Sequence, residues 1–177
     1  MKHGFIVLSI AMAVALLMLP AALAAPSVPQ RNVFFTKTTS NPVPQPGETF
    51  TFKLLFGLTQ TATQSIDVRV IDPNPAPEYL KILTDTITGG AFYSPTIDGV
   101  VWEGSLSVGT LFYGFEFQAQ VTGIPTTALT TGYTVTNRAE MLNLTTPGSL
   151  PEATAQVQFR IMPRRIWLPV TLRGYGA

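Results

Sequence analysis

The chain has no cysteine among its 177 residues. This absence excludes disulfide bonds, thiolate metal sites and a cysteine nucleophile. The single histidine is His3, at the extreme N-terminus, so the rest of the chain has no imidazole for a catalytic triad or a zinc site. We therefore expect no enzymatic activity, no metal and no cofactor.

Charge is also scarce, because Asp, Glu, Lys and Arg make up only 12% of the residues. The full chain has eleven basic and ten acidic side chains, and loss of Lys2 would leave ten of each. A net charge of zero provides no field that would attract nucleic acid or an acidic membrane. We expect neither as a partner.

Residues 1–24 have the layout of a secretory signal peptide. Lys2 and His3 form a short basic start, residues 5–19 are an uncharged apolar run, and Ala22-Leu23-Ala24 fits the small-x-small cleavage rule. The run is shorter than the ~20 residues that a spanning helix needs. The pattern predicts cleavage after Ala24, a secreted or cell-surface protein, and no membrane span after cleavage; retention as an uncleaved anchor is the alternative.

Beyond the signal peptide, apolar and polar residues alternate with a period of two, and no sustained helical period occurs. Eight such segments are separated by turns rich in Pro and Gly: 33–38, 49–56, 66–72, 79–85, 99–103, 115–122, 134–141 and 153–161. Strands with one apolar and one polar face are typical of an antiparallel β-sandwich. We predict one all-β domain over residues 25–162, with about seven to nine strands and a tail at 163–177; a closed barrel is the second choice.

Five features along this domain suggest a family. In chain order they are Lys37, Pro46-Gly47-Glu48, Asp72 before Pro73, Trp102 to Leu106, and Asn137-Arg138-Ala139. This order resembles the conserved-repeat, immunoglobulin-like (Ig-like) domain of bacterial and archaeal surface proteins, domain of unknown function eleven. The chain departs from that pattern at Phe56-Gly57-Leu58, where the family usually has Asn-x-Gly, and at Phe52, where it has Tyr. The resemblance implies an Ig-like sandwich outside the cell, used as a stalk, spacer or adhesive module toward an envelope or extracellular protein or glycan.

Three polar residues share the parity of apolar rows. Lys37 follows Val33 and Phe35, Asp72 follows Val68 and Val70, and Asn137 lies between Val135 and Ala139. Their side chains are therefore expected in the core. A buried Lys, a buried carboxylic acid and an Asn are the components of a self-formed isopeptide bond, and their order resembles that in Gram-positive adhesin and pilin Ig-like domains.

Simpler roles remain open for the same three residues. Asn137 could hydrogen-bond the backbone at a bulge, and Asp72 could cap a turn before Pro73. Lys37 could extend its amine to the solvent at the rim of the sandwich.

Other candidate sites are weaker. Trp102 and Tyr113, with Tyr93 and Phe112, could form a sugar-stacking face, although a Trp at this position more often packs in the core of the sandwich. Asp98 and Glu103 could form a glycosidase pair, but no wider set of residues supports such a site. Asp67, Asp72, Asp85 and Asp98 could bind calcium, but they do not have the alternating spacing of ligands in a calcium loop.

The sequence thus predicts an exported, non-enzymatic structural or adhesive module. The alternatives are a carbohydrate-binding module and a subunit of a surface or pilus-like assembly with a Lys37–Asn137 bond. The tail could dock as an edge strand, serve as an address or fray.

Overall fold

The structure, a computed structural model, describes residues 32–110, 112–145 and 151–164. The predicted signal peptide and residues 165–177 of the tail lie outside this range, so the expectations about them stay predictions. In the described residues, no helix is long and apolar enough to cross a membrane.

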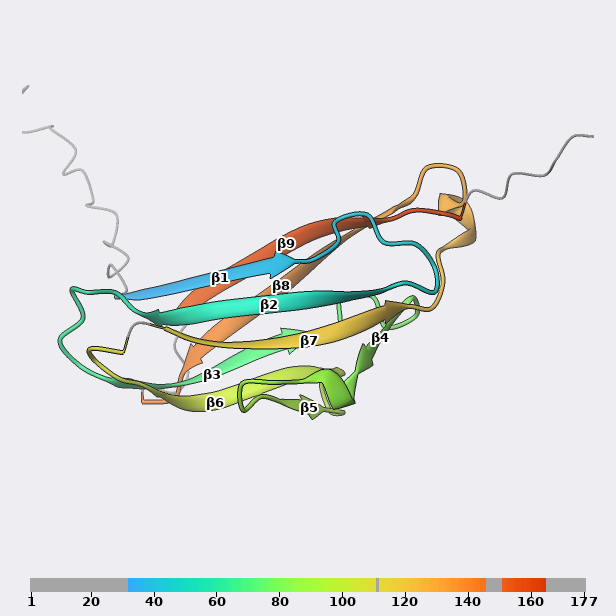
Figure 1. Cartoon of the computed structure of the whole chain (residues 1–177). Helices are drawn as coiled ribbons and strands as arrows, with labels where there is room; N and C mark the ends of the chain where they lie inside the picture. Colours follow the sequence, from blue (N-terminus) through green and yellow to red (C-terminus); the bar gives the residue numbers. More distant parts are fainter. Residues whose placement is uncertain (1–31, 111, 146–150, 165–177) are drawn as a thin grey trace, which may run out of the picture. The chain divides into compact units, whose positions relative to one another are not determined.

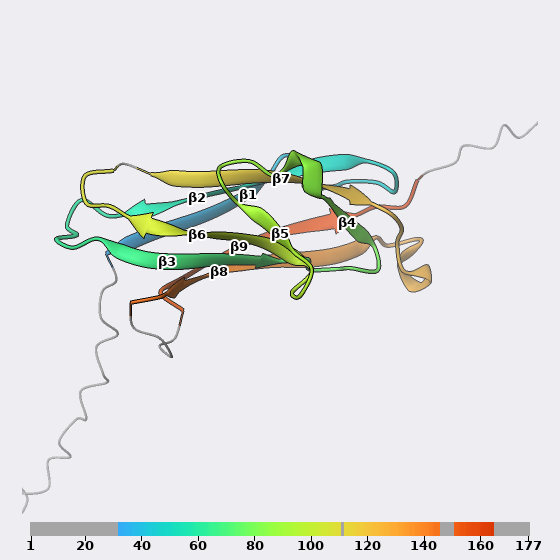
Figure 2. The same ribbon diagram turned by 90° about the horizontal axis from the view of Figure 1, so that it is seen from below.

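Two antiparallel sheets form the domain (Figures 1 and 2). The first sheet has the order β1 (Val33–Thr39), β2 (Thr49–Leu58), β7 (Tyr113–Val121), β4 (Leu80–Leu83). The second has the order β5 (Phe92–Ser94), β6 (Gly99–Leu106), β3 (Ile66–Pro73), β8 (Tyr133–Asn143), β9 (Ala153–Ile161). The predicted all-β Ig-like sandwich is confirmed, and the two separate sheets exclude the closed barrel.

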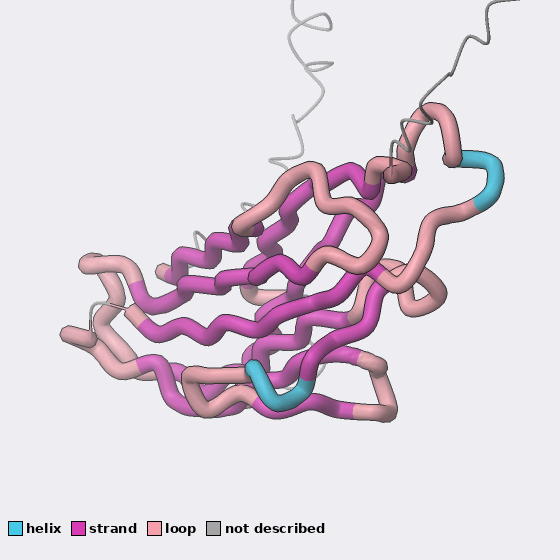
Figure 3. The backbone as a smooth tube through the Cα atoms, turned by 45° about the vertical axis from the view of Figure 1, so that its right-hand side comes forward, coloured by secondary structure: helices cyan, strands magenta, loops and turns pink. Residues whose placement is uncertain are grey.

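Within the described residues, helix is confined to two short 3₁₀ turns, η2 (Thr84–Thr86) and η3 (Thr126–Ala128) (Figure 3). The first of them corrects the sequence prediction, because the strand expected over 79–85 ends at Leu83. A second correction is β5, which was not predicted. Its three residues are too few to show an alternating pattern, and it exists because it pairs with residues 99–101 of β6.

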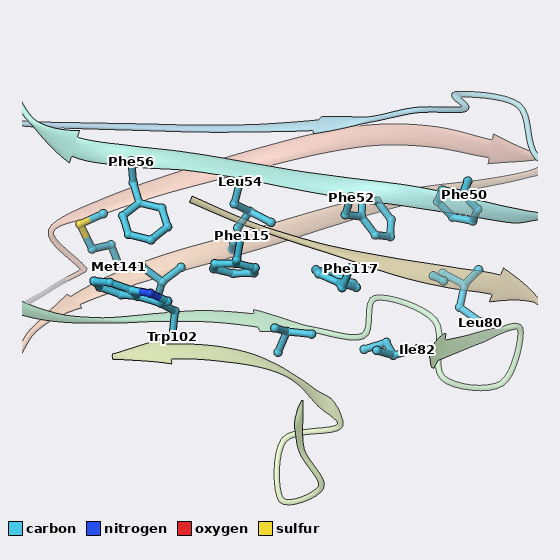
Figure 4. Close-up of a cluster of buried hydrophobic side chains, with 14 of the residues drawn as sticks. Phe50, Phe52, Leu54, Phe56, Leu80, Ile82, Trp102, Phe115, Phe117 and Met141 are labelled. Atoms are coloured by element: carbon cyan, nitrogen blue, oxygen red, sulfur yellow. The ribbon is translucent and has the colours of Figure 1, made fainter. Parts of the chain in front are cut away.

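Phenylalanine fills most of the space between the sheets. The inward side chains of β2 are Phe50, Phe52, Leu54 and Phe56, all at most 2% exposed. They lie beside Phe115 and Phe117 of the neighbouring strand β7 and face Trp102 and Met141 of the opposite sheet (Figure 4). Large aromatic rings bury much apolar area per side chain, which supplies stability that a chain without disulfides must obtain from its core.

Two threonines close the outer edge of β7 beyond the short strand β4. The backbone N–H of Thr88 donates to the carbonyl of Glu116 at 3.0 Å. The N–H groups of Gln118 and Glu116 donate to the hydroxyls of Thr86 and Thr88, at 2.9 and 3.2 Å. Side-chain oxygens thus take the place of a neighbouring strand at Glu116 and Gln118, and the N–H groups of these two residues are satisfied.

The segment that carries these threonines turns at Gly89, which has φ +66°. Its carbonyl accepts a hydrogen bond from the Trp102 indole at 3.1 Å. A Cβ at this position would collide with the carbonyl oxygen of Gly114. Gly89 therefore permits both the turn and the close approach to β7.

We expect Gly89→Ala to lower the free energy of unfolding by about 2–4 kcal/mol, from left-handed strain plus the collision. Gly109→Ala is the matched control, since Gly109 also has positive φ but has nothing within 4 Å of a new Cβ. It should cost only about 1–2 kcal/mol. Denaturant unfolding of both variants measures the difference, and equal losses would contradict the proposed collision.

Candidate functional site

Three polar side chains lie inside the apolar core. Lys37, Asp72 and Asn137 are 7%, 0% and 1% exposed, and they are the buried polar or charged residues of the described chain. Lys37 comes from β1 in the first sheet, whereas Asp72 and Asn137 come from β3 and β8 in the second. The cluster therefore bridges the two layers of the sandwich.

The Lys37 amine and the Asp72 carboxyl are in direct contact. Nζ lies 2.5 Å from both Oδ1 and Oδ2, and neither side chain is exposed to solvent. The Phe52 ring covers the amine, with its centroid 5.1 Å from Nζ. Water is thus excluded on the side where the core aromatic rings lie.

Burial shifts the pKa of both groups toward their neutral forms. Desolvation lowers the pKa of Lys37 to about 8, although the charge and hydrogen bond of Asp72 oppose the shift. Desolvation likewise raises the pKa of Asp72, against the opposing effects of Lys37 and of Asn137. Transfer of one proton from the amine to the carboxyl would remove both charges from a medium that disfavours them.

The carboxamide of Asn137 is the unusual member of the cluster. Among the described residues, neither Nδ2 nor Oδ1 has a hydrogen-bond partner of normal geometry. The group nevertheless lies close enough to Asp72 to lower the pKa of that carboxyl. A buried carboxamide without partners costs about 1–3 kcal/mol for each unsatisfied group, so its position calls for a reason other than stability.

The structure brings together the three residues that strand parity placed in the core. It also decides among the simpler roles. The Lys37 side chain does not reach the solvent, the Asn137 carboxamide has no backbone partner in the described residues, and the Asp72 carboxylate bonds Lys37 rather than a turn. The alternation of side chains along each strand could not show that Lys37 belongs to one sheet and that Asp72 and Asn137 belong to the facing sheet.

The predicted sugar-stacking face does not form as expected, because Trp102 is only 8% exposed. Its ring packs edge-on against Phe56, with centroids 4.9 Å apart. Tyr113 stacks beside the same two rings, and its hydroxyl accepts a hydrogen bond from the Ser107 N–H. Of the two roles considered for Trp102, the structure shows core packing and not an exposed ligand face: the bulky ring lies where it buries most apolar area.

The weaker carboxylate candidates are engaged elsewhere. Asp98 accepts hydrogen bonds from Tyr93 and Asn74, and Glu103 pairs with Arg69 on the surface at 2.6 Å. The part of the chain that the structure describes contains no group of three or more potential metal ligands.

No family model matches the sequence, and no curated protein matches it. Solved structures do resemble the fold. The major pilin subunit BcpA of Bacillus cereus aligns with a TM-score of 0.50 and 10% identity, over 74% of this chain and 40% of the pilin. At this identity the likeness shows the fold alone, and the chain spans two fifths of that pilin's length.

Two further structures align less closely. The C-terminal fragment of the major pilin GBS80 of Streptococcus agalactiae has a TM-score of 0.48 and 8% identity, over 73% of this chain and 56% of the fragment. The CARDB domain of the PF1109 protein of Pyrococcus furiosus has a TM-score of 0.44 and 11% identity, over 73% of this chain and 86% of that domain.

We expect Lys37→Met to lower the free energy of unfolding by about 3–5 kcal/mol, because the Asp72 carboxylate would lose its buried partner. Lys53→Met is the matched control. Lys53 pairs with Glu116 at 2.7 Å, but both side chains are roughly half exposed, so its loss should cost less than about 1 kcal/mol. Urea unfolding of the two variants at pH 7 makes the comparison.

The deficit of Lys37→Met should depend on pH in a defined direction. Burial raises the folded-state pKa of Asp72, and Lys37 opposes that rise, so the carboxyl of the variant, which has no Lys37, holds its proton still more tightly in the folded state than that of wild type does. The Asp72 contribution to stability is then fully present below the unfolded value of 3.8 and is lost as the pH rises through the folded-state pKa. Unfolding at pH 4 should therefore show a smaller deficit than at pH 7, and the opposite order would refute the assignment.

Proposed function

We propose that the chain is an exported, non-enzymatic structural module of the cell envelope or extracellular space. Its two sheets are joined by an isopeptide bond that forms between Lys37 and Asn137. One observation carries the proposal: beside the buried Lys–Asp pair lies a buried Asn carboxamide, close enough to lower the pKa of Asp72 but without a hydrogen-bond partner of normal geometry in the described residues. The signal-peptide pattern in residues 1–24 supports export.

The reaction needs no group beyond these three side chains. Lys37 passes a proton to Asp72, which leaves a neutral amine and a carboxylic acid. The amine nitrogen attacks Cγ of Asn137 while the acid donates a hydrogen bond to Oδ1 and polarises the carbonyl. Asp72 then accepts the second proton from the attacking nitrogen as it delivers the first to Nδ2.

The C–N bond to Nδ2 breaks, and the nitrogen leaves as ammonia. One amine and one carboxamide thus become one secondary amide and one ammonia, and Asp72 ends protonated, holding the second of the two protons that the Lys37 nitrogen gives up. Exclusion of water from the site protects the tetrahedral intermediate from diversion to hydrolysis. The preorganised neighbours, rather than any strong nucleophile, supply the rate.

The product would do for this chain what a disulfide does for other exported domains. The bond closes a loop of about 100 residues, for which the chain-entropy relation for disulfides gives about 4–5 kcal/mol of stabilisation. It would also satisfy the carboxamide, because the ammonia nitrogen leaves and the new amide lies beside Asp72.

Intact mass spectrometry of the secreted protein tests the proposal. The expected mass is that of the chain from Ala25 onward less one ammonia. Lys37→Met, Asp72→Ala and Asn137→Ala should each retain the full mass of their sequence, whereas the surface variant Lys53→Met should still lose ammonia. Tandem fragmentation should locate the branch at Lys37. A wild-type mass with no ammonia missing rejects the bond.

The rate of bond formation should be bell-shaped in pH. The reactive pair holds a single proton: with two, Lys37 is an ammonium, and with none, Asp72 cannot donate. Because the pKa of Lys37 is lowered to about 8, the alkaline decline should begin near pH 8, and the acid decline should follow the raised pKa of Asp72. The chain is kept unfolded in urea, so that the bond has not yet formed, and is then diluted into buffers across the pH range. The loss of ammonia is timed from the moment of dilution. A rate that keeps rising above pH 10 would contradict the role of Asp72 as the acid.

A further inference from the structure

We propose that the cross-linked fold bears tension between its two ends and yields only the short stretches outside the covalent loop, of which β9 is the one complete strand. The inference rests on the proposed Lys37–Asn137 bond and goes beyond it, because it concerns which part of the chain remains outside the covalent loop. It follows from strand order and direction, not from the chemistry of the site.

The bond would close the chain between the first strand and the penultimate one. Strands β2 to β7 lie wholly inside the loop, between Lys37 and Asn137. Outside it lie the first residues of β1, the second half of β8 and all of β9. Tension applied at the two ends would pass through the isopeptide bond and bypass most of the core.

The direction of pull is along the strands. β1 begins at one end of the sandwich and β9 finishes at the opposite end (Figure 1). β9 is antiparallel to β8, so a pull on the C-terminal side slides β9 along a neighbour that is fixed at Asn137. Hydrogen bonds in an antiparallel pair are perpendicular to the strands, and a sliding pull therefore loads them together rather than one after another.

β9 is held on both of its edges. On one side it pairs with β8 from Tyr133↔Ile161 to Met141↔Ala153. On the other, the N–H groups of Arg160 and Met162 donate to the carbonyls of Pro42 and Pro44, each at 2.9 Å. Phe159 and Ile161 extend into the core and are 2% and 0% exposed.

All of these contacts are non-covalent, whereas strands β2 to β7 would be locked inside the loop. β9 is therefore the strand that gives way, and the part of its docking site inside the closed loop stays in place for its return: residues 133–137 of β8 and the carbonyls of Pro42 and Pro44. The extensible chain is at most about 28 residues, or about 100 Å at the length of an extended residue. Without the bond, the chain from Val33 to Ile161 could extend by about 450 Å.

Single-molecule pulling tests the inference on the chain from residue 25 to 177, held between marker domains of known unfolding length. The cross-linked protein should show one short step and should recover it on relaxation. Asn137→Ala, which cannot form the bond, should show a step at least fourfold longer. Ile161→Ala should keep the short step but lower its force, whereas Gln158→Ala, on the exposed face of β9, should leave it unchanged.

The outcomes separate this inference from the cross-link itself. If the mass shows that ammonia has been lost, but the chain is pulled until the tether breaks and no short step is seen, the proposal that β9 extends is wrong and the bond itself is still supported. An Ile161→Ala force equal to that of wild type also overturns it. Retained ammonia together with a full-length step in wild type rejects both proposals.

Discussion

The contact between Lys37 and Asp72 is the constraint on which the rest of the structure depends. Two opposite charges have been removed from water and placed 2.5 Å apart between two sheets. Desolvation of such a pair cancels much of its attraction, so its net stabilisation is small. Its structural effect is nevertheless specific. The amine can meet the carboxyl only when β1 and β3 lie opposite each other in one register, so the pair fixes the alignment of the layers.

The aromatic core makes that pair chemically useful. Phe52 contacts Phe50, Phe117 and Phe159 as well as covering the Lys37 amine, so the same rings that stabilise the sandwich keep water from the amine. A drier site favours the neutral forms of both groups. The chain has no cysteine and so no disulfide, but a Lys, an acid and an Asn in a dry core are the components of another covalent cross-link. Unlike a disulfide, that bond would not be broken by a reducing agent.

Much of this could be predicted from the sequence. Alternation places a side chain on one face or the other of a strand, and this alone put Lys37, Asp72 and Asn137 in the core. It could not say which strands are neighbours, because pairing depends on packing between segments far apart in the chain. For that reason β5 was missed, and an exposed ligand face at Trp102 stayed open beside the favoured core position. The unsatisfied Asn137 carboxamide was also beyond prediction, since hydrogen-bond partners depend on coordinates.

The threonines that cover part of the edge of β7 also affect how strands of separate copies of the chain could pair. A bare row of backbone donors and acceptors along a strand edge can pair with another chain and promote aggregation. Thr86 and Thr88 accept hydrogen bonds from the N–H groups of Glu116 and Gln118 within the molecule. At these two residues the edge therefore offers no free N–H group to a strand of a second copy.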